Sequence, residues 1–223
     1  MAHSKPQIID KPLDLNSVEL QDLLGLIIHS YNNHLTGIMG HTELAQLEEC
    51  SAGHKLAFDQ VLSSGYGAIQ LGHDLLTVIG RSLLSLQSLP ISQLLELLSE
   101  QLADEKLVLN LSQLDDFNID TDKAYFVDVL TLLVRFIQVL FKEQSDQNTP
   151  SITIQTNKDH RLEILASEIN LTTEQQASLF NPFYSSRMLT ENKDVGLAKA
   201  KGFFKQTGAS IEWINQRGFI IQF

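Results

Sequence analysis

The strongest chemical pattern in the chain is the stretch of residues 27–44, IIHSYNNHLTGIMGHTEL, which contains His29 and Asn33. Their spacing of four residues places both side chains on one face of a helix, one turn apart. His29 directly follows the apolar residue Ile28, so we expect its imidazole at the edge of an apolar stripe, facing water. An exposed imidazole can act as a nucleophile or carry a proton. The alternative at this point is an exposed helix histidine without a role.

Three other histidines, in this stretch or in the next helical pattern, do not suggest a metal centre. His34, His41 and His73 have no second ligand at the spacing of a metal site, so we interpret them as ordinary helix residues. Cys50 is the only cysteine, which excludes an intramolecular disulfide and a cysteine-based metal cluster. We therefore predict that the protein has no metal site.

Two long helical patterns must form the scaffold of His29. Asn16, three residues before Glu19, indicates a capping box that starts the first helix, which runs to about residue 48. The break Ser51-Ala52-Gly53 separates it from a second helical stretch over about residues 55–88. Both helices carry apolar seams at heptad spacing. The seam residues are Leu24, Ile28, Tyr31, Leu35, Ile38, Thr42 and Ala45, and then Leu62, Ile69, Leu76 and Leu83.

A hairpin of two such helices has more apolar surface than it can bury alone. We therefore predict a homodimer in which residues 14–89 of each copy form a four-helix bundle, preceded by a tail of residues 1–13. Gly25, Gly37 and Gly40 each cost a helix about 1 kcal/mol relative to alanine, which indicates that a partner approaches closely there.

The pattern changes after Pro90, and residues 90–223 mix helices with strands. Helical patterns cover about 91–104, 122–142, 173–180 and 195–206, and alternating apolar residues predict strands in LVLNL, FNI, SITIQT, RLEILA, GASIEWI and GFIIQF. This order predicts an α+β fold, an α/β sandwich with three helices against a mixed sheet.

Composition limits the classes of function. The 223 residues are 43% hydrophobic and 19% charged, as in a globular protein. The net charge of −11 argues against a nucleic-acid partner, because neutralising phosphates needs clustered Lys and Arg. The first residues, MAHSKPQIIDKP, lack the pattern of a signal peptide, and no apolar run reaches the ~20 residues of a membrane helix. We therefore expect a soluble, cytoplasmic protein that is not inserted in a membrane.

Residues 27–44 resemble the phosphoacceptor box of histidine kinases. The resemblance implies that His29 is phosphorylated at a ring nitrogen and exchanges the phosphoryl group with an aspartate of a response-regulator receiver domain. Asn33 matches the residue that, in bifunctional members, positions a water for dephosphorylating the receiver. Ser30 replaces the acidic residue that usually follows the histidine. Since serine cannot orient the imidazole by charge, this change weakens autokinase chemistry more than phosphotransfer.

Residues 90–223 resemble the ATPase-like domain of the same kinases, most clearly in DKAYFVDVLTLLVRFI, SLFNPFYSSR and DVGLAKAKGFFKQTGASIEW. The family's nucleotide-binding residues are missing. Leu132 and Phe136 replace the helix asparagines, and a shift by one residue gives Thr131 and Arg135. The adenine and glycine boxes have lost their residues at Ala166, Glu168, Asn170 and Asp194. Without the glycines of these boxes, the backbone cannot turn closely around an adenine ring. Asp194 would place a negative charge where the triphosphate of ATP should lie. We therefore predict no ATP binding and no cofactor.

The resemblance leaves three functions open. The favoured one is a dimeric histidine phosphotransfer protein of a two-component phosphorelay, in which His29 shuttles phosphate between receivers. The second is a non-catalytic pseudo-histidine kinase that binds and regulates receivers or a partner sensor kinase. The third, least favoured, is an active histidine kinase. The expected partners are receiver domains and a second copy of the chain.

Overall fold

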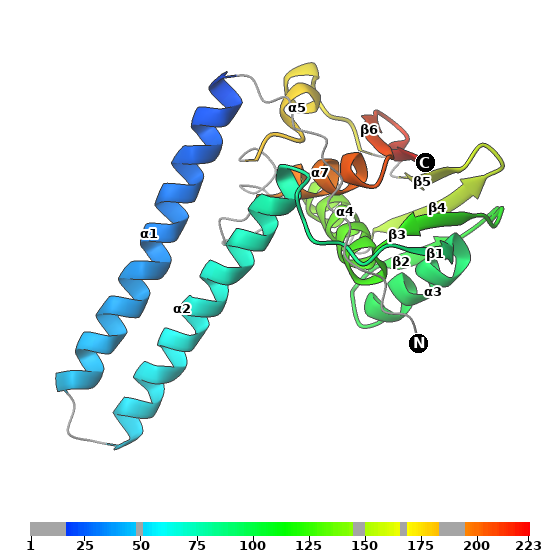
Figure 1. The fold of residues 1–223 in the computed structure, drawn as a ribbon. Helices are drawn as coiled ribbons and strands as arrows, with labels where there is room; N and C mark the ends of the chain where they lie inside the picture. The colour runs from blue at the N-terminus through cyan, green and yellow to red at the C-terminus, as the bar shows by residue number, and fades with distance from the viewer. Residues whose placement is uncertain (1–16, 48–50, 145–149, 166–168, 183–194) are drawn as a thin grey trace.

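The computed structural model describes residues 17–47, 51–144, 150–165, 169–182 and 195–223 (Figure 1). Within these, only the backbone is described for residues 17–26, 28–29, 46–47, 51–54, 57 and 143. The side chain of His29 is therefore not described. Predictions were also made for Asn16, Cys50, Ala166, Glu168 and Asp194, and these residues lie outside the described part of the chain.

The first half of the chain is a helical hairpin of α1 (Ser17–Leu47) and α2 (Ser51–Val78), which run antiparallel to each other (Figure 1). Small residues allow the two helices to approach. A Cβ at Gly37 would lie 2.7 Å from Ser64 Oγ, and one at Gly67 would lie 2.9 Å from His34 Nδ1. His34 thus packs over α2, in agreement with its interpretation as an ordinary helix residue.

The predicted bounds of the second helix were wrong at both ends. Residues 51–53, predicted as a break, belong to α2, which ends at Val78 rather than near residue 88. It ends in a Schellman turn: Gly80 has φ 70°, its N–H donates to Thr77 O, and Arg81 N–H donates to Leu76 O. Glycine takes this left-handed conformation at little cost. Leu83 therefore lies beyond the helix and outside the heptad seam.

The remaining elements form the α/β region, residues 87–223. Its strands are β1 (Gln87–Pro90), β2 (Val108–Leu111), β3 (Asn118–Thr121), β4 (Ser151–Asn157), β5 (Arg161–Leu165), β6 (Ser210–Ile214) and β7 (Gly218–Gln222). In the described residues the main sheet has the order β2-β4-β5-β7-β6, in which β2 and β4 are parallel and the other pairs antiparallel. Strands β1 and β3 form a separate antiparallel pair, and β1 was not predicted.

The helices of the α/β region are α3 (Ile91–Gln101), α4 (Lys123–Gln144), the short α5 (Thr173–Ser178) and α7 (Ala198–Gln206). Side chains of α3, α4 and α7 pack with those of the sheet in one core, which includes Leu95, Leu130, Phe203 and Ile164. The predicted α+β architecture with a mixed sheet is thus confirmed.

Helix α4 is the most apolar element of this core. Among the described residues it is the one helix long and apolar enough to cross a membrane by length and composition, over Lys123–Lys142. Its apolar side chains are largely buried inside the protein, as expected for a core helix. Asp122 caps it: Oδ1 accepts hydrogen bonds from the N–H groups of Ala124 and Tyr125.

Candidate functional site

His29 lies in the N-terminal half of α1, and its neighbours define the surroundings of that turn. Ser30 is 6% exposed, whereas Asn33, one turn further along, is exposed. Ile27 packs against a small apolar cluster of Val78, Val195 and Ala198. The turn that carries His29 therefore lies against the end of α2 and the start of α7, and the buried Ser30 replaces the carboxylate expected from the family.

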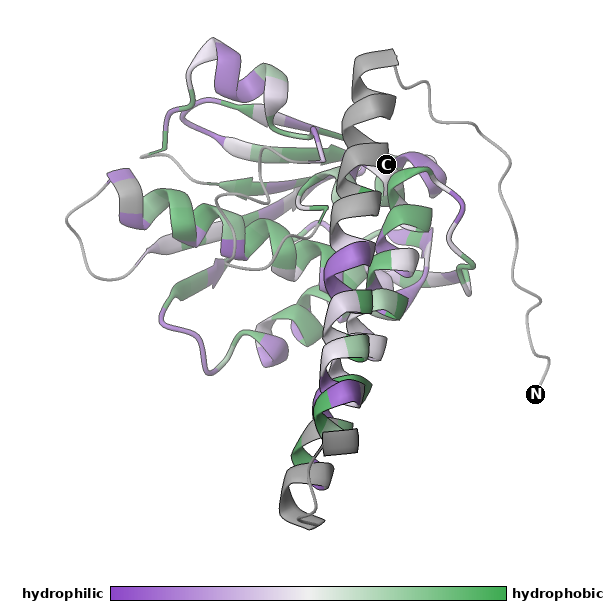
Figure 2. Ribbon diagram, turned by 90° about the vertical axis from the view of Figure 1, so that its left-hand side faces the viewer, coloured by the Kyte–Doolittle hydropathy of each residue, from purple (hydrophilic) through white to green (hydrophobic). Residues whose placement is uncertain are grey.

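Several large apolar side chains of the hairpin, most of them seam residues, are exposed. Tyr31 and Leu35 on α1 are 45% and 46% exposed. On α2 the exposed fractions are 57% for Leu62, 69% for Tyr66 and 59% for Ile69. Figure 2 shows the hairpin in front, with hydrophobic and hydrophilic residues alternating along its described part. Isolated exposed apolar residues are common on proteins, whereas exposed apolar residues gathered on two neighbouring helices are a feature of many interaction surfaces.

The positions that match the family's magnesium-binding asparagines are filled with apolar side chains. Leu132 is half-buried against the core, and Phe136 is completely buried. The Phe136 ring packs against Phe219 at 6.1 Å between centroids. Neither side chain can coordinate a cation, because both lack a donor oxygen or nitrogen.

The neighbouring register supplies no cation ligand either. The Thr131 hydroxyl is buried and donates to Val127 O within its own helix, 2.9 Å away. Arg135 points to the surface, where its guanidinium pairs with Glu105 at 2.8 Å. The absence of a magnesium ligand on this part of α4 therefore does not depend on the alignment chosen.

The segment that matches the adenine box is fixed by hydrogen bonds to its backbone. Ala166 and Glu168 lie outside the described residues, but Asn170 is described and exposed. The Gln144 carboxamide accepts from Asn170 N–H and donates to Asn170 O, both at 3.3 Å. Asn215 pairs with the backbone of Leu171 in the same way, at 2.9 and 2.8 Å. Ile169 and Leu171 thereby enter the core that contains Phe136.

The glycine box retains one residue in the described structure, Gly196, with φ 54°. It lies in the buried segment Val195–Ala198, which leads into α7. Asp194 itself lies outside the described residues. Of the positions predicted to have lost nucleotide-binding residues, the structure therefore brings Leu132, Phe136 and the backbone at Asn170 around one apolar core. His29 and Asn33 lie on the hairpin, outside this core.

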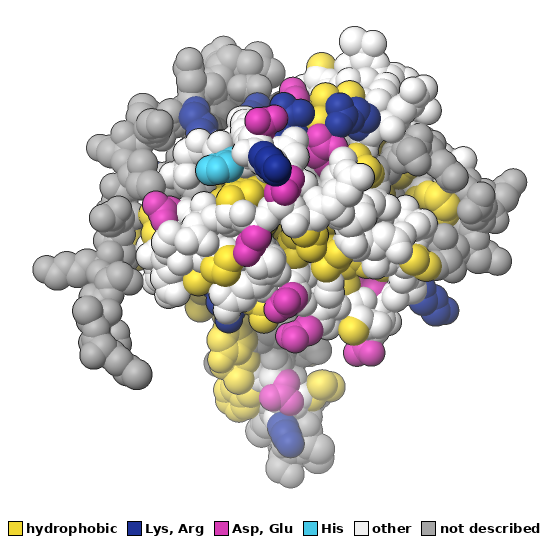
Figure 3. All heavy atoms as spheres, turned by 90° about the vertical axis from the view of Figure 1, so that its right-hand side faces the viewer, with side chains coloured by type: hydrophobic (Ala, Val, Ile, Leu, Met, Phe, Trp, Pro, Cys, Tyr) yellow, Lys and Arg dark blue, Asp and Glu magenta, His cyan; other side chains and the backbone are white. Residues whose placement is uncertain are grey.

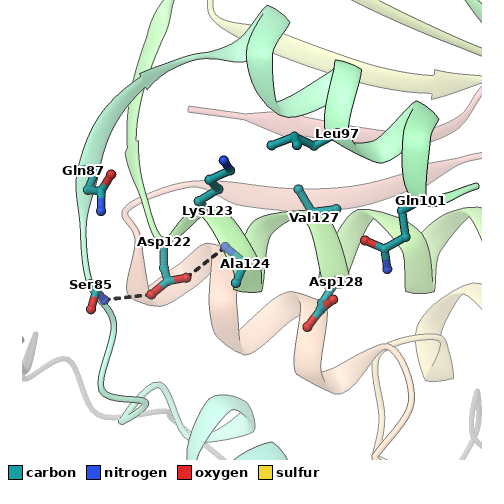
Figure 4. A pocket seen from close by; sticks show the side chains of 9 residues that line it. All are labelled: Ser85, Gln87, Leu97, Gln101, Asp122, Lys123, Ala124, Val127 and Asp128. Carbon is teal, nitrogen blue, oxygen red and sulfur yellow. Dashed lines mark hydrogen bonds between the residues drawn. The ribbon is translucent and has the colours of Figure 1, made fainter.

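A pocket of about 410 Å³ lies elsewhere, between α3, the start of α4 and the segment before β1 (Figure 4). Leu97 and Val127 give it apolar walls, and Gln87, Lys123 and Asp128 are polar residues in its lining. None of the residues predicted from the sequence lines it. The capping Asp122 is one of its residues, and Asp directly before a helical pattern was the signal that could have identified that cap.

Charges on the face of the α/β region away from the hairpin are mixed. Figure 3 shows Lys and Arg side chains standing among Asp and Glu rather than in one basic patch. The sheet itself carries a buried carboxylate, Glu163, which accepts two hydrogen bonds from Arg217 at 2.9 Å and one from Gln155 at 2.8 Å. This described face therefore lacks the one-sided positive charge of a nucleic-acid surface.

Comparison with known proteins supports the fold. No protein-family model and no curated protein matches the sequence. Among solved structures, histidine kinase AdeS of Acinetobacter baumannii aligns with a TM-score of 0.52 and 19% identity over 89% of this chain and 95% of that one. Full-length ShkA in complex with AMPPNP aligns with a TM-score of 0.52 and 15% identity, over 90% of this chain and 45% of that one.

A structure described as a bacterial phosphotransferase spans 94% of this chain, but its TM-score of 0.38 is too low to support an argument. The likeness to AdeS and ShkA at this level of identity concerns the fold. The chain therefore has a histidine kinase-like fold, a helical hairpin followed by an α/β region of the ATPase-like type.

Proposed function

We propose that the protein is a dimeric, cytoplasmic histidine phosphotransfer protein, which moves a phosphoryl group between His29 and the aspartates of receiver domains without binding ATP. One observation carries the proposal: the chain keeps the phosphoacceptor box on α1, while Leu132 and the buried Phe136 occupy the positions of the nucleotide-binding asparagines. A two-component role agrees with the histidine kinase-like fold.

The proposed reaction needs little from this chain beyond the imidazole. A ring nitrogen of His29 attacks the phosphorus of the phospho-aspartate, a nitrogen–phosphorus bond forms, and the phosphorus–oxygen bond to the aspartate breaks. The aspartate leaves as a carboxylate, and the reverse step returns the phosphoryl group to a receiver. The receiver supplies its own metal ion and lysine, so the serine at position 30 is tolerated more easily here than in attack on ATP.

The exposed seams support the dimer. Leu62, Tyr66 and Ile69 on α2 and Tyr31 and Leu35 on α1 would be removed from water if two hairpins packed into a four-helix bundle. Burying apolar surface is worth roughly 25 cal/mol per Å², which makes such a row of exposed side chains costly to leave in water. A symmetric dimer buries the same residues of both copies.

The test incubates the protein with each of two phosphoryl donors in separate reactions, a phosphorylated receiver and Mg-ATP. We expect labelled phosphate to move onto the chain from a phosphorylated receiver and not from Mg-ATP. The label should be acid-labile and base-stable, as expected of a phosphoramidate. His29→Ala should abolish the label. His41→Ala, the same substitution further along α1, should leave the label in place.

Two further outcomes separate the alternatives. Receiver binding without any label would favour the non-catalytic regulator over the phosphotransfer protein. Label from ATP alone would show a working kinase and contradict the proposal. Ser30→Glu restores the acidic residue, and we expect it to create no labelling from ATP, because the α/β region still lacks the nucleotide-binding residues.

A further inference from the structure

The end of α2 and helix α7 approach each other more closely than side chains would allow. A Cβ added at Gly202 would clash with the carbonyl oxygen of Thr77 and lie 2.7 Å from that of Val78. These are backbone atoms at the end of a helix, so neither can move aside as a side chain could. The contact therefore requires glycine at position 202, where α7 lies directly on the last turn of α2.

Next to this contact, a side chain of α7 forms hydrogen bonds with both backbone groups of a residue in the segment after α2. The Gln206 carboxamide accepts from Ser82 N–H at 3.2 Å and donates to Ser82 O at 2.7 Å. Both residues are 2% exposed. The Ser82 hydroxyl lies 2.6 Å from Thr77 Oγ1. Buried polar groups lose much stability when they lose their partners, so this arrangement resists separation.

An ion pair closes the other side of the contact. Lys199 Nζ lies 2.8 Å from Asp74 Oδ1, and the two side chains are 17% and 11% exposed. Asp74 also accepts a hydrogen bond from Gln70. Removing one member of such a shielded pair leaves the other charge without its partner, which favours the paired arrangement over a separated one.

The segment between Gly80 and β1 is anchored along its length. Leu84 is 1% exposed and belongs to the core of the α/β region, and Ser85 N–H donates to Asp122 Oδ2 at 2.8 Å. A flexible linker between two parts of a protein is exposed and makes few contacts. This segment alternates, with Arg81, Leu83 and Ser85 exposed, but it is anchored by the buried Ser82 and Leu84 and by its hydrogen bonds.

We propose that these contacts form a permanent clasp that fixes the α/β region to the hairpin in one orientation. The clasp consists of Gly202 against the end of α2, Gln206 with Ser82, and Lys199 with Asp74. The α/β region is then a static part of the molecule that holds the turn of His29 through Ile27, rather than a body that swings on a linker. This inference is independent of the proposed phosphotransfer, and either can fail without the other.

The test measures the distance between two spin labels by double electron–electron resonance. The labels are placed at exposed positions, Asp59→Cys on α2 and Glu96→Cys on α3, in the full chain with Cys50→Ser. Labelled protein is diluted with excess unlabelled protein, so that distances between copies do not contribute. We expect one narrow distance distribution, which Gly202→Ala shifts or splits, because the new methyl group forces α7 away from α2.

Gly72→Ala is the matched control, since nothing lies within 4 Å of the position where its Cβ would stand, and it should leave the distribution unchanged. Gln206→Leu and Lys199→Met should broaden it, and they decide the question if Gly202→Ala does not fold. A broad or multiple distribution in the parent protein would overturn the clasp. So would an unchanged distribution in the folded clasp variants.

Discussion

Helices α1 and α4 are both long and rich in apolar residues, yet they use them in opposite ways. On α4 the apolar side chains are buried inside the α/β region, and Phe136 stands in the core where the family has a polar ligand. On α1, Tyr31 and Leu35 remain exposed within the stretch of residues 27–44 that resembles the phosphoacceptor box. Under the proposed function, the α/β region would serve as scaffold, whereas the hairpin would present the surface for partners.

The conversion of a ligand position into core has an energetic reason. An asparagine at position 136 would be buried without its nucleotide and would cost stability unless another partner satisfied it. Phenylalanine removes that cost and adds packing against Phe219. Once nucleotide binding is not required, an apolar residue is therefore favoured at this position.

The largest expected effect is on assembly and tests the exposed side of the comparison. Replacing Leu62 and Ile69 together with glutamate places charges in the predicted dimer interface while changing little in a single copy, where both are exposed. Light scattering should show a fall from about twice the chain mass of 25.0 kDa to that mass itself. Val108→Glu, on the exposed edge strand β2, should leave the dimer intact. A parent protein that is already monomeric would contradict the four-helix bundle.

The second largest expected effect is on stability and tests whether the apolar side chains of α4 form the core. Phe136→Ala should lower the free energy of unfolding by about 3–5 kcal/mol, because it opens a cavity in the core. Arg135→Ala, at the neighbouring position, removes an ion pair whose arginine side chain is 57% exposed, and should cost no more than about 1 kcal/mol. Urea unfolding of both variants measures the difference. Similar small losses would mean that Phe136 is not core and that this position remains available to a ligand.

A third prediction concerns the interior of the hairpin. Gly67→Ala should destabilise it by about 1–3 kcal/mol, because the new methyl group meets the His34 ring, which must leave its place or push the helices apart. Ser63→Ala, at an exposed position of α2, should change stability by less than about 0.5 kcal/mol. Thermal unfolding followed by circular dichroism compares the two. An unchanged midpoint for Gly67→Ala would show that the His34 ring is not packed against position 67 as described.

The smallest expected effect on phosphotransfer is that of Asn33→Ala. Asn33 lies one turn from His29 and is exposed, so its loss leaves the nucleophile in place. Transfer from a phosphorylated receiver should remain largely intact, whereas any dephosphorylation of the receiver by this protein should slow. Separate time courses for the two reactions measure this. A loss of transfer equal to that of His29→Ala would show that Asn33 takes part in the transfer itself.

Much of the fold could be predicted because its signals are local. Alternating apolar residues in SITIQT and RLEILA predicted β4 and β5, and the apolar pattern after Asp122 predicted α4. The end of α2 was missed, although Gly80 is a recognisable helix-stop residue. Strand β1 was missed because four residues show no periodicity, and their pairing with β3 is a tertiary contact.

The candidate site also has features that the sequence could predict and features that depend on tertiary contacts. The loss of polar ligands at Leu132 and Phe136 can be read from residue types alone. The burial of Ser30 and the contact of Ile27 with Val195 depend on how the hairpin meets the α/β region. The Gln206–Ser82 pairing joins residues 124 apart in the chain, so no local pattern could indicate it.

The most direct test of the central claim is to locate the phosphoryl group. The protein is incubated with a phosphorylated receiver, digested at neutral to basic pH to preserve phosphohistidine, and sequenced by electron-transfer tandem mass spectrometry. The account predicts that the phosphoryl group lies on His29, in the absence of any nucleotide. A phosphoryl group on His34, His41 or Ser30 instead would contradict it.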